Sequence, residues 1–392
     1  MLKIVFIFVL FFCPLQAFAL LLMNRTQLNY VRANGDAVYD VELSRLFKKA
    51  DLFCKTPNAT VMNKKHIPAS GSKHDYMSLA RYSWPNPNTS NGLPYISKDG
   101  KTNPEINEYD RNEIASLGKR MKVLTLAWFF SGRKKYSEKA VEQLRTWFID
   151  ETTRMNPNLS FAQIVPGTNN GYGNASGVID SYTLILVVDC VLLLKETDQI
   201  SEGDYESIKK WFRNFTDWMV RSVQGRTASN FNNNISVIYE TQLLAYKSFA
   251  LEKIDSNEVF RVFEDRIVSQ IDEEGKQLRE LKRTNSYHYS QFNLIHLVDY
   301  VIIAKNQKID VLLQEGMRQK LYRALDFLSL FLGENRSFWQ YRQDGDWHDA
   351  QMSLCETLYR VYNQYDSTQS RYNQLYLQYY KNDRNNFFTL YN

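Results

Sequence analysis

Residues 178–195 are apolar on almost every side of a helix, and this feature most constrains the fold. From Val178 to Leu194 the run is broken only by Asp180, Asp189 and three hydroxyl-bearing residues. A helix that is apolar all round is normally buried between other layers. The chain must therefore supply enough further elements to surround one central helix.

An amphipathic helix is predicted over residues 203–222. Apolar residues recur there at helical spacing with charged residues between them. Trp211 and Trp218 belong to this stripe, which indicates core packing rather than a sugar platform. The same type of pattern predicts helices at 36–54, 109–131, 136–150, 236–253, 257–272, 288–305, 310–333 and 348–364.

No run of alternating polar and apolar residues predicts a sheet, so the sequence indicates an all-α fold. Paired helices that return on one another form bundles, solenoids or closed α/α toroids. The Tyr-rich tail, residues 359–380, predicts one or two closing helices.

The first nineteen residues have the features of a signal peptide. Lys3 is followed by the apolar run 4–13, and Ala17-Phe18-Ala19 has the small-x-small cleavage pattern. The apolar run is too short for a comfortable membrane span. We therefore expect a periplasmic or secreted protein, with no stable membrane insertion after cleavage and a single domain over residues 20–392.

Charge and cysteine content exclude several classes of protein. Lys and Arg number 48 against 43 Asp and Glu, which fits an acidic ligand or an ordinary solvated surface. No block of like charges indicates nucleic-acid binding. Cys54, Cys190 and Cys355 cannot all pair with one another, and only a Cys54–Cys355 bridge is left open. No CxxC, HExxH or GxGxxG motif occurs, so no metal or cofactor is predicted; the oligomeric state is not indicated.

Two long loops carry aromatic and polar residues. Residues 55–108 hold six of the nine prolines together with Tyr76 and Trp84, and residues 156–177 are rich in Asn and Gly. Long ordered loops of this kind tend to be functional.

The segment from Arg283 to Tyr289 combines a permanent cation, an imidazole and a phenol. Arg283 can bind a carboxylate through two parallel hydrogen bonds, and His288 and Tyr289 can transfer protons. This combination suits removal of a proton beside a carboxylate that has been neutralised. By themselves the same residues also fit a surface Arg and a half-buried Tyr, as the cluster Asn232–Asn234 fits a helix cap.

A uronic-acid polymer requires this kind of chemistry. The C5 proton lies beside the carboxylate, and its removal becomes feasible when Arg, Asn, Lys or His donors neutralise that group. An acid must then protonate the departing O4. One Tyr can perform both transfers on the same face of the sugar; its ordinary pKa is about 10, and a cation such as Arg283 would help it act as a base.

Three ordered segments of the chain resemble the alginate lyase superfamily. Residues 75–87 read DYMSLARYSWPNP and are similar to the family stretch DYMSLAPYWWPNP. Residues 155–167 read MNPNLSFAQIVPG and resemble MNPNLxYAQxxPG, and residues 280–294 read ELKRTNSYHYSQFNL and resemble ELxRTxSxHYSxFNL. The resemblance runs from about residue 60 to 300. It implies an α/α toroid and a secreted polysaccharide lyase acting on a β-1,4-linked uronan.

The resemblance assigns roles to individual residues. Arg283 falls on the carboxylate-binding arginine and Tyr289 on the catalytic tyrosine, which is the acid and in some members also the base. The motif NNHGTWYDxQ falls on residues 233–242, which makes Asn234 the neutralising asparagine, or Asn233 if one residue is inserted. The resemblance also implies a set of residues that hold the sugar chain: Lys73, His74, Tyr76, Arg81, Trp84, Asn233 and Tyr239.

The motif histidine is missing, because Ile235 stands at its position in an ungapped match. Three interpretations follow. The leading one is that Tyr289 performs both proton transfers in a syn elimination, with Arg283 and Asn234 neutralising the carboxylate. In the others, His288 or His74 substitutes for the lost imidazole, or the chain only binds sugar. The substitution also widens the substrate class from alginate and polymannuronate to related uronans such as glucuronan. A toroid glycoside hydrolase would instead need a carboxylate pair, for which Asp344, Asp346 and Asp349 are the candidates.

Overall fold

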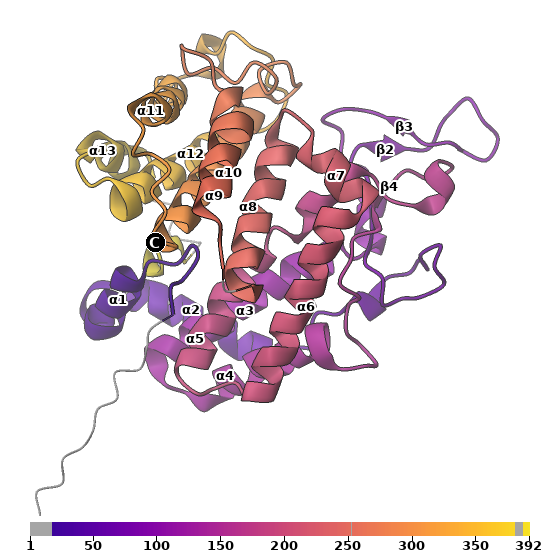
Figure 1. The fold of residues 1–392 in the computed structure, drawn as a ribbon, viewed down its shortest axis with the longest axis horizontal. Coiled ribbons are helices and arrows are strands. Elements are labelled where there is room, and N and C mark those ends of the chain that lie inside the picture. The colour runs from indigo at the N-terminus through magenta and orange to yellow at the C-terminus, as the bar shows by residue number, and fades with distance from the viewer. Residues whose placement is uncertain (1–17, 252, 381–386) are drawn as a thin grey trace, which may run out of the picture.

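Helical hairpins form an incomplete toroid in the computed structural model, which describes residues 18–251, 253–380 and 387–392 (Figure 1). Each inner helix contacts the next around the ring. The inner helices are α3 (Arg111–Ser131), α5 (Leu184–Glu196), α8 (Asn234–Ala250), α10 (Ser286–Asn306) and α12 (Trp347–Arg360). The predicted all-α toroid is confirmed.

An outer layer of helices covers this ring. α2 and α4 pack on α3, α6 packs on α8, α11 contacts α10 and α12, and α13 packs on α12. The outer helices and the shorter connecting ones are α1 (Arg25–Val38), α2 (Asp40–Cys54), α4 (Lys134–Leu144), α6 (Glu202–Arg221), α7 (Val223–Ser229), α9 (Ser256–Val262), α11 (Glu315–Ser329) and α13 (Ser370–Tyr379).

The central helix of the prediction is α5, and its residues from Leu184 to Leu194 are buried apart from Leu186. Its Asp189 is fully buried and accepts hydrogen bonds from the backbone N–H groups of Leu21, Leu22 and Met23 at 2.5–2.9 Å. One continuous hydrophobic core runs through both layers. Cys54, Cys190 and Cys355 are all free, so the Cys54–Cys355 bridge that the sequence left open is absent from the described residues.

Residues 1–17 of the predicted signal peptide lie outside the described residues. Phe18 and Ala19 are exposed, whereas the chain from Leu20 to Met23 is buried. No single helix in the described part of the chain is long and apolar enough to cross a membrane. One bent pair, Asn169–Ser181 with Leu184–Glu196 at 49°, passes that test by length and composition.

The predicted helix over residues 36–54 is wrong at its start. The structure has two helices there, α1 and α2, which meet at Tyr39. Asn34-Gly35 resembles a turn signal but lies inside α1, where the glycine permits close packing. A Cβ on Gly35 would lie 2.6 Å from the Leu43 Cδ1 atom of α2. The predicted helix over 257–272 is likewise shorter, because α9 ends at Val262 and continues as a π-turn and a 3₁₀ turn.

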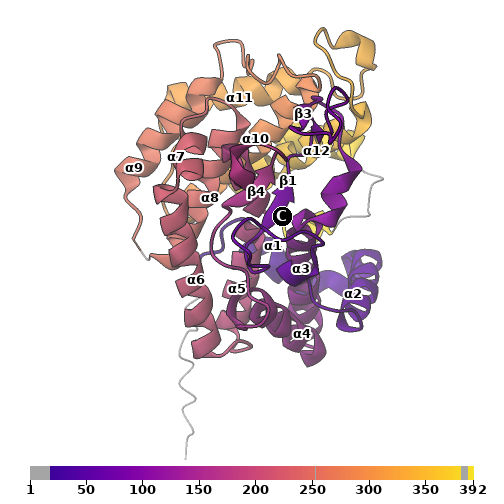
Figure 2. The ribbon, with the colours of Figure 1, turned by 90° about the vertical axis from the view of Figure 1, so that its right-hand side faces the viewer.

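Four short strands tie the two long loops to the toroid. β1 (Met77–Leu79) pairs in parallel with β4 (Phe161–Ile164), and β2 (Ser83–Trp84) pairs antiparallel with β3 (Ile96–Ser97). A small second core, which includes Met77, Leu79 and Phe161, lies beneath them. The strands and their loops lie on one side of the toroid, on the right in Figure 1 and facing the viewer in Figure 2.

Candidate active site

The N-terminal turn of α10 carries His288 and Tyr289 and is fixed by the segment around Gln343. The first N–H groups of a helix have no partner within it. Here the side-chain Oε1 of Gln343 accepts hydrogen bonds from the backbone N–H groups of Tyr287 and His288 at 3.1 and 3.3 Å. The backbone of Ser286 donates to the Arg342 carbonyl at 3.0 Å. These contacts hold His288 and Tyr289 in a set orientation.

The Tyr289 side chain lies between a second tyrosine and an arginine. Its hydroxyl is 2.7 Å from the hydroxyl of Tyr82, which precedes β2. The guanidinium carbon of Arg283 lies 3.7 Å from the centroid of the Tyr289 ring. The His288 ring centroid is 5.4 Å from that of Tyr289. Arg283, His288 and Tyr289, which the sequence predicted as one group, are thus close together.

Arg283 is paired with a carboxylate of the β3 loop. Its Nη2 lies 2.9 Å from Asp99 Oδ1, and the Thr284 hydroxyl donates to Asp99 Oδ2 at 3.0 Å. Burial alone would raise the pKa of Asp99, but its hydrogen bonds to Arg283 and Thr284 bring that pKa below its ordinary value. The Arg283 side chain is 31% exposed, so solvent and a substrate can reach it.

The pKa values of Tyr289 and His288 are shifted in opposite directions. Burial raises the pKa of Tyr289, the hydrogen bond with Tyr82 adds to this rise, and the charge of Arg283 opposes it. Burial and the charges of Arg81 and Arg283 lower the pKa of His288. The sequence argument expected Arg283 to lower the pKa of Tyr289; the charge acts in that direction, but burial outweighs it. At neutral pH, Tyr289 is therefore a protonated phenol and His288 a neutral imidazole.

A further arginine near the two tyrosines, Arg111, is paired with the buried carboxylate of Asp180. Arg111, at the start of α3, lies 3.4 Å from Asp180, and the charge of Asp180 raises the pKa of Arg111. Tyr82 and Tyr289 also raise the pKa of Arg111, so both tyrosines are near enough to interact with its charge. Asp180 also accepts hydrogen bonds from Tyr76 at 3.1 Å and Ser78 at 2.6 Å. Tyr76, predicted to bind substrate, is fully buried and contributes to this support instead of facing solvent.

Asn233 and Asn234 lie at the N-terminus of α8, and both are engaged in local contacts. Asn233 is the N-cap, and its side chain accepts from the Ile235 N–H at 3.0 Å. The Asn234 amide donates to both carboxylate oxygens of Glu280 at 2.9 Å. The Asn234 amide nitrogen is therefore engaged by a carboxylate of the protein itself. Glu280 lies in the same loop as Arg283, and the backbone N–H of Arg283 donates to the Glu280 carbonyl. The Asn234–Glu280 contact therefore fixes the loop that carries Arg283.

Three other predicted substrate-binding residues have partners away from Tyr289. Tyr239 is buried and donates its hydroxyl hydrogen bond to the Met219 carbonyl at 3.2 Å. The His74 ring lies 2.7 Å from the Arg154 carbonyl, and the Lys73 ammonium donates to the Met62 carbonyl at 3.4 Å. No contact links these residues to Tyr289 in the described part of the chain, and their roles stay predictions.

Arg81 and Trp84 lie on the loop segment that carries Tyr82. Arg81 is exposed, and its charge reaches His288. Trp84 is half-buried, with its indole N–H donating to the Lys101 carbonyl at 2.9 Å and the Lys98 ammonium 5.0 Å from its ring. Both residues thus belong to the exposed hairpin next to Tyr289.

Sequence reasoning missed three residues of this group: Tyr82, Asp99 and Arg111. Each lies more than one hundred residues from Tyr289 along the chain. Tyr82 lies in segment 75–87, which resembles the family, but nothing in that segment predicted its contact with Tyr289.

Two of the three carboxylates considered for a hydrolase, Asp344 and Asp346, have structural partners. Asp344 forms an ion pair with Arg342 at 2.6 Å. Asp346 is the N-cap of α12 and accepts the N–H of Asp349 at 2.7 Å. In the described residues, no group of three or more His, Cys, Asp or Glu side chains could hold a metal ion.

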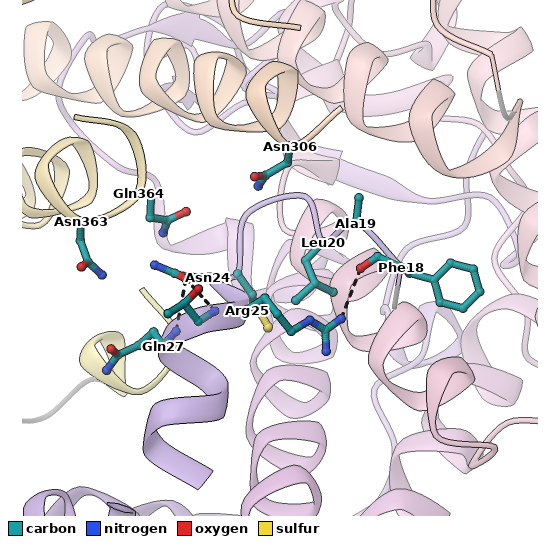
Figure 3. A pocket seen from close by; sticks show the side chains of 11 residues that line it. Phe18, Ala19, Leu20, Asn24, Arg25, Gln27, Asn306, Asn363 and Gln364 are labelled. Carbon is teal, nitrogen blue, oxygen red and sulfur yellow. Dashed lines mark hydrogen bonds between the residues drawn. The ribbon is translucent and has the colours of Figure 1, made fainter. Parts of the chain in front are cut away.

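A cavity of about 450 Å³ beside the N-terminal segment lies apart from this group (Figure 3). Asn306, at the far end of α10, lines it, and this residue is about 26 Å from Tyr289 at 1.5 Å per helical residue. Its amides already serve the fold: Asn24 caps α1, Asn306 donates to the Leu21 carbonyl, and Asn363 donates to the Asn392 carbonyl. His288 and Tyr289, the predicted proton-transfer residues, lie at the other end of the helix.

The toroidal fold, together with the family that the sequence matches, identifies a polysaccharide lyase. The chain belongs to the alginate lyase family, because the family model described as "Alginate lyase" matches residues 60–339. A solved structure of an alginate lyase from Bacteroides ovatus is 32% identical, with a TM-score of 0.90, over 95% of this chain and 98% of that one.

A second solved structure resembles the fold at lower identity. It is a variant of alginate lyase A1-III complexed with a tetrasaccharide, and it is 14% identical with a TM-score of 0.50. The likeness covers 81% of this chain and 86% of that one. No curated protein matches the sequence.

Proposed function

We propose that this polysaccharide lyase cleaves a uronic-acid-containing polysaccharide by β-elimination. The substrate is alginate, polymannuronate or a related uronan such as glucuronan. The observation that carries the proposal is the Tyr289 hydroxyl, which lies against Tyr82 with Arg283 over its ring. Membership of the alginate lyase family and the tetrasaccharide bound by a structural relative support an acidic polysaccharide substrate.

Arg283 is the group that neutralises the substrate carboxylate. In the free protein the Asp99 carboxylate occupies Arg283 at 2.9 Å, so it stands where a uronate carboxylate would bind. Arg111 adds positive charge beside the two tyrosines. Charge that develops on the carboxyl group during C5 deprotonation is then stabilised by fixed cations. Asn234 supports this arrangement through its hydrogen bonds to Glu280, which lies in the loop that carries Arg283.

Tyr289 donates the proton to the departing O4, because its raised pKa keeps the phenol protonated at neutral pH. His288 takes the C5 proton, because its lowered pKa keeps the imidazole neutral. Two neighbouring groups whose pKa values are shifted apart mark an acid and a base. The second mechanism is a syn elimination in which Tyr289 performs both transfers, and removal of the His288 imidazole separates the two.

The test is ultraviolet absorbance of the new C4=C5 double bond after incubation with a panel of uronans. The panel contains polymannuronate, polyguluronate, glucuronan, and acetylated or sulfated uronates. A rise on one polymer establishes elimination and identifies the substrate. Chain shortening without a double bond would indicate hydrolysis, and binding without any product would favour the sugar-binding protein that the loss of the motif histidine at Ile235 suggested.

We further propose that the protein is periplasmic or secreted after removal of residues 1–19. The start of the buried chain at Leu20 supports this boundary, because Phe18 and Ala19 are exposed. Mass spectrometry of the protein recovered outside the cytoplasm should give an N-terminus at Leu20. A protein retained in the cytoplasm with residues 1–19 intact would contradict it.

A further inference from the structure

The segment 342–345, just before α12, pairs with the loop in front of α10. An isolated antiparallel bridge joins Asn285 to Gln343, and the backbone N–H of Asp344 donates to the Thr284 carbonyl at 2.9 Å. Successive side chains of an extended segment point to opposite faces. Because Thr284 and Asp344 are opposite each other beside the bridge, they share one face of this pairing.

Two Arg–Asp ion pairs lie next to each other at this face. Arg283 Nη2 is 2.9 Å from Asp99 Oδ1, and the Thr284 hydroxyl donates to the other oxygen of Asp99 at 3.0 Å. Arg342 Nη2 is 2.6 Å from Asp344, the residue opposite Thr284. The hydrogen bond with Asp344 raises the pKa of Arg342, and the charge of Asp99 adds to that rise. Arg342 is therefore near enough to Asp99 to interact with its charge.

The Arg342 guanidinium is open to solvent and only partly used. Its side chain is 67% exposed, compared with 31% for Arg283. Its Nε and Nη2 donate to Asp344, whereas its Nη1 has no hydrogen-bond partner among the described residues. Asp344 is itself 50% exposed. An exposed pair of this kind contributes little to stability, so the carboxylate of a ligand can replace Asp344 at low cost.

A uronan carries a carboxylate on every sugar, so a chain held at Arg283 brings a second carboxylate beside it. Arginine presents parallel N–H groups that match the two oxygens of such a group. Arg336 also lies nearby, but its guanidinium already donates to three backbone carbonyls of the segment 339–343. Arg342 is the arginine next to Arg283 whose one partner is an exposed side chain.

We propose that Arg342 binds the carboxylate of the uronate next to the one that Arg283 neutralises. Asp344 occupies Arg342 in the free protein, as Asp99 occupies Arg283. The inference rests on the proposed lyase function and adds a specificity-determining residue to it. Arg342 lies outside residues 60–339, which the family model matches, so that match assigns it no role. Two neighbouring cations favour a polymer whose consecutive sugars are both uronates over one in which uronates alternate with neutral sugars.

The test is steady-state kinetics on the uronan that gives the largest rise in ultraviolet absorbance. Arg342→Gln should raise KM about fivefold and leave kcat unchanged, because the lost contact is made to a sugar that does not react. Asp344→Asn should lower KM, since it frees Arg342. The matched control is Lys282→Gln, which removes an exposed cation next to Arg283 in the chain. Its effect on KM should stay below about twofold, because salt screens an exposed charge that makes no contact.

A second substrate separates contact with a neighbouring carboxylate from a general effect of charge. It is the same uronan with part of its carboxylates reduced to alcohols, so that fewer charged sugars have a charged neighbour. The unmodified protein should have a higher KM for this polymer. The difference in KM between Arg342→Gln and the unmodified protein should shrink on it, because the partner of Arg342 is often missing.

The outcomes distinguish this inference from the lyase function on which it rests. Cleavage with the same KM in Arg342→Gln and the unmodified protein would overturn the role of Arg342 and leave the lyase function standing. An equal rise of KM in Lys282→Gln, or a fall in kcat in Arg342→Gln with native circular dichroism, would also overturn it.

If no polymer yields a double bond, the lyase function fails, and calorimetry decides about Arg342. The probes are the hexamers of mannuronate, guluronate and glucuronate. Weaker binding of a hexamer to Arg342→Gln than to Lys282→Gln would support the contact with a uronate. Equal binding to both variants, or no binding to the unmodified protein, would overturn it.

Discussion

The hydroxyl oxygens of Tyr82 and Tyr289 lie 2.7 Å apart, although 207 positions separate these residues in the chain. Tyr82 comes from the loop that precedes β2, and Tyr289 comes from the first turn of α10. The contact therefore joins the exposed hairpin to the toroid wall. It also sets the protonation of Tyr289, because a hydrogen bond from one phenol to the other stabilises the neutral pair.

Replacing Tyr82 with Phe should shift the alkaline limb of the pH–rate profile to lower pH. The hydrogen bond with Tyr82 raises the pKa of Tyr289, so its loss leaves that pKa lower. An acid with a lower pKa loses its proton at a lower pH, and the rate then falls sooner as pH rises. The measurement is kcat against pH for both proteins; a limb that stays in place would show that Tyr82 does not act through Tyr289.

Replacing Tyr289 with Phe should lower kcat by about 10²–10⁴-fold, which is the usual contribution of a positioned acid or base. The fold should stay intact, since the ring remains in place. Tyr30→Phe is the matched control, because Tyr30 is an exposed tyrosine on α1 and its loss should not alter kcat. A Tyr289→Phe protein with most of its activity would exclude Tyr289 as the acid.

Replacing His288 with Gln should remove the acidic limb of the kcat/KM profile. The lowered pKa of His288 means that the imidazole stays neutral as pH falls to its ordinary value of about 6.5 and gains a proton only below it. If His288 is the base, the enzyme should stay active as pH falls to that value and should lose activity at lower pH. If His288→Gln keeps full activity, Tyr289 performs both transfers. Circular dichroism should confirm that the variant retains its fold.

Helix content was predictable from the sequence because apolar periodicity is a local signal. Residues 178–195 were expected to be buried, and α5 is the central helix. The strands were not predictable, since β2 and β3 have two residues each and are too short to show a period. Helix α1 was not predicted, and the Asn34-Gly35 pair inside it resembles a turn signal. The glycine is needed there because α1 packs closely on Leu43 of α2, and this contact cannot be read from the local sequence.

The candidate site was predictable only where its residues are neighbours in the chain. Arg283, His288 and Tyr289 lie within one turn of loop and helix, so their proximity follows from the sequence. Asp99 and Arg111 are brought next to Arg283 and Tyr289 by the folding of long loops. No local sequence pattern predicts contacts of this kind. Asn234 illustrates the same limit, because its amide binds Glu280, 46 residues away.

Replacing Asn234 with Ala should reduce stability by about 1–3 kcal/mol, because Glu280 loses its buried side-chain donor and keeps only the backbone N–H of residue 234. Burial raises the pKa of Glu280, and the hydrogen bonds from Asn234 oppose that rise. Without the side-chain hydrogen bond the folded-state pKa of Glu280 rises further, so its ionisation costs more in the folded state, and the loss of stability should be larger at pH 7 than at pH 4. Urea unfolding at both pH values measures this.

The matched control for that variant is Asn233→Ala, which removes only the N-cap of α8. Its cost should be about 1 kcal/mol and should not change between the two pH values. Equal pH dependence for both variants would contradict a specific role for the Asn234–Glu280 pair.

Replacing Asp99 with Asn should lower KM for the polymer. Asp99 occupies Arg283 in the free protein and competes with the substrate carboxylate for the same donors. Both side chains are about one third exposed, and pairs of this kind are worth about 0–1 kcal/mol, so KM should fall by up to about fivefold. Asp204→Asn, which breaks the exposed pair with Arg145, is the control and should leave KM unchanged. A higher KM in Asp99→Asn would mean that Asp99 orients Arg283 for the substrate instead of competing with it.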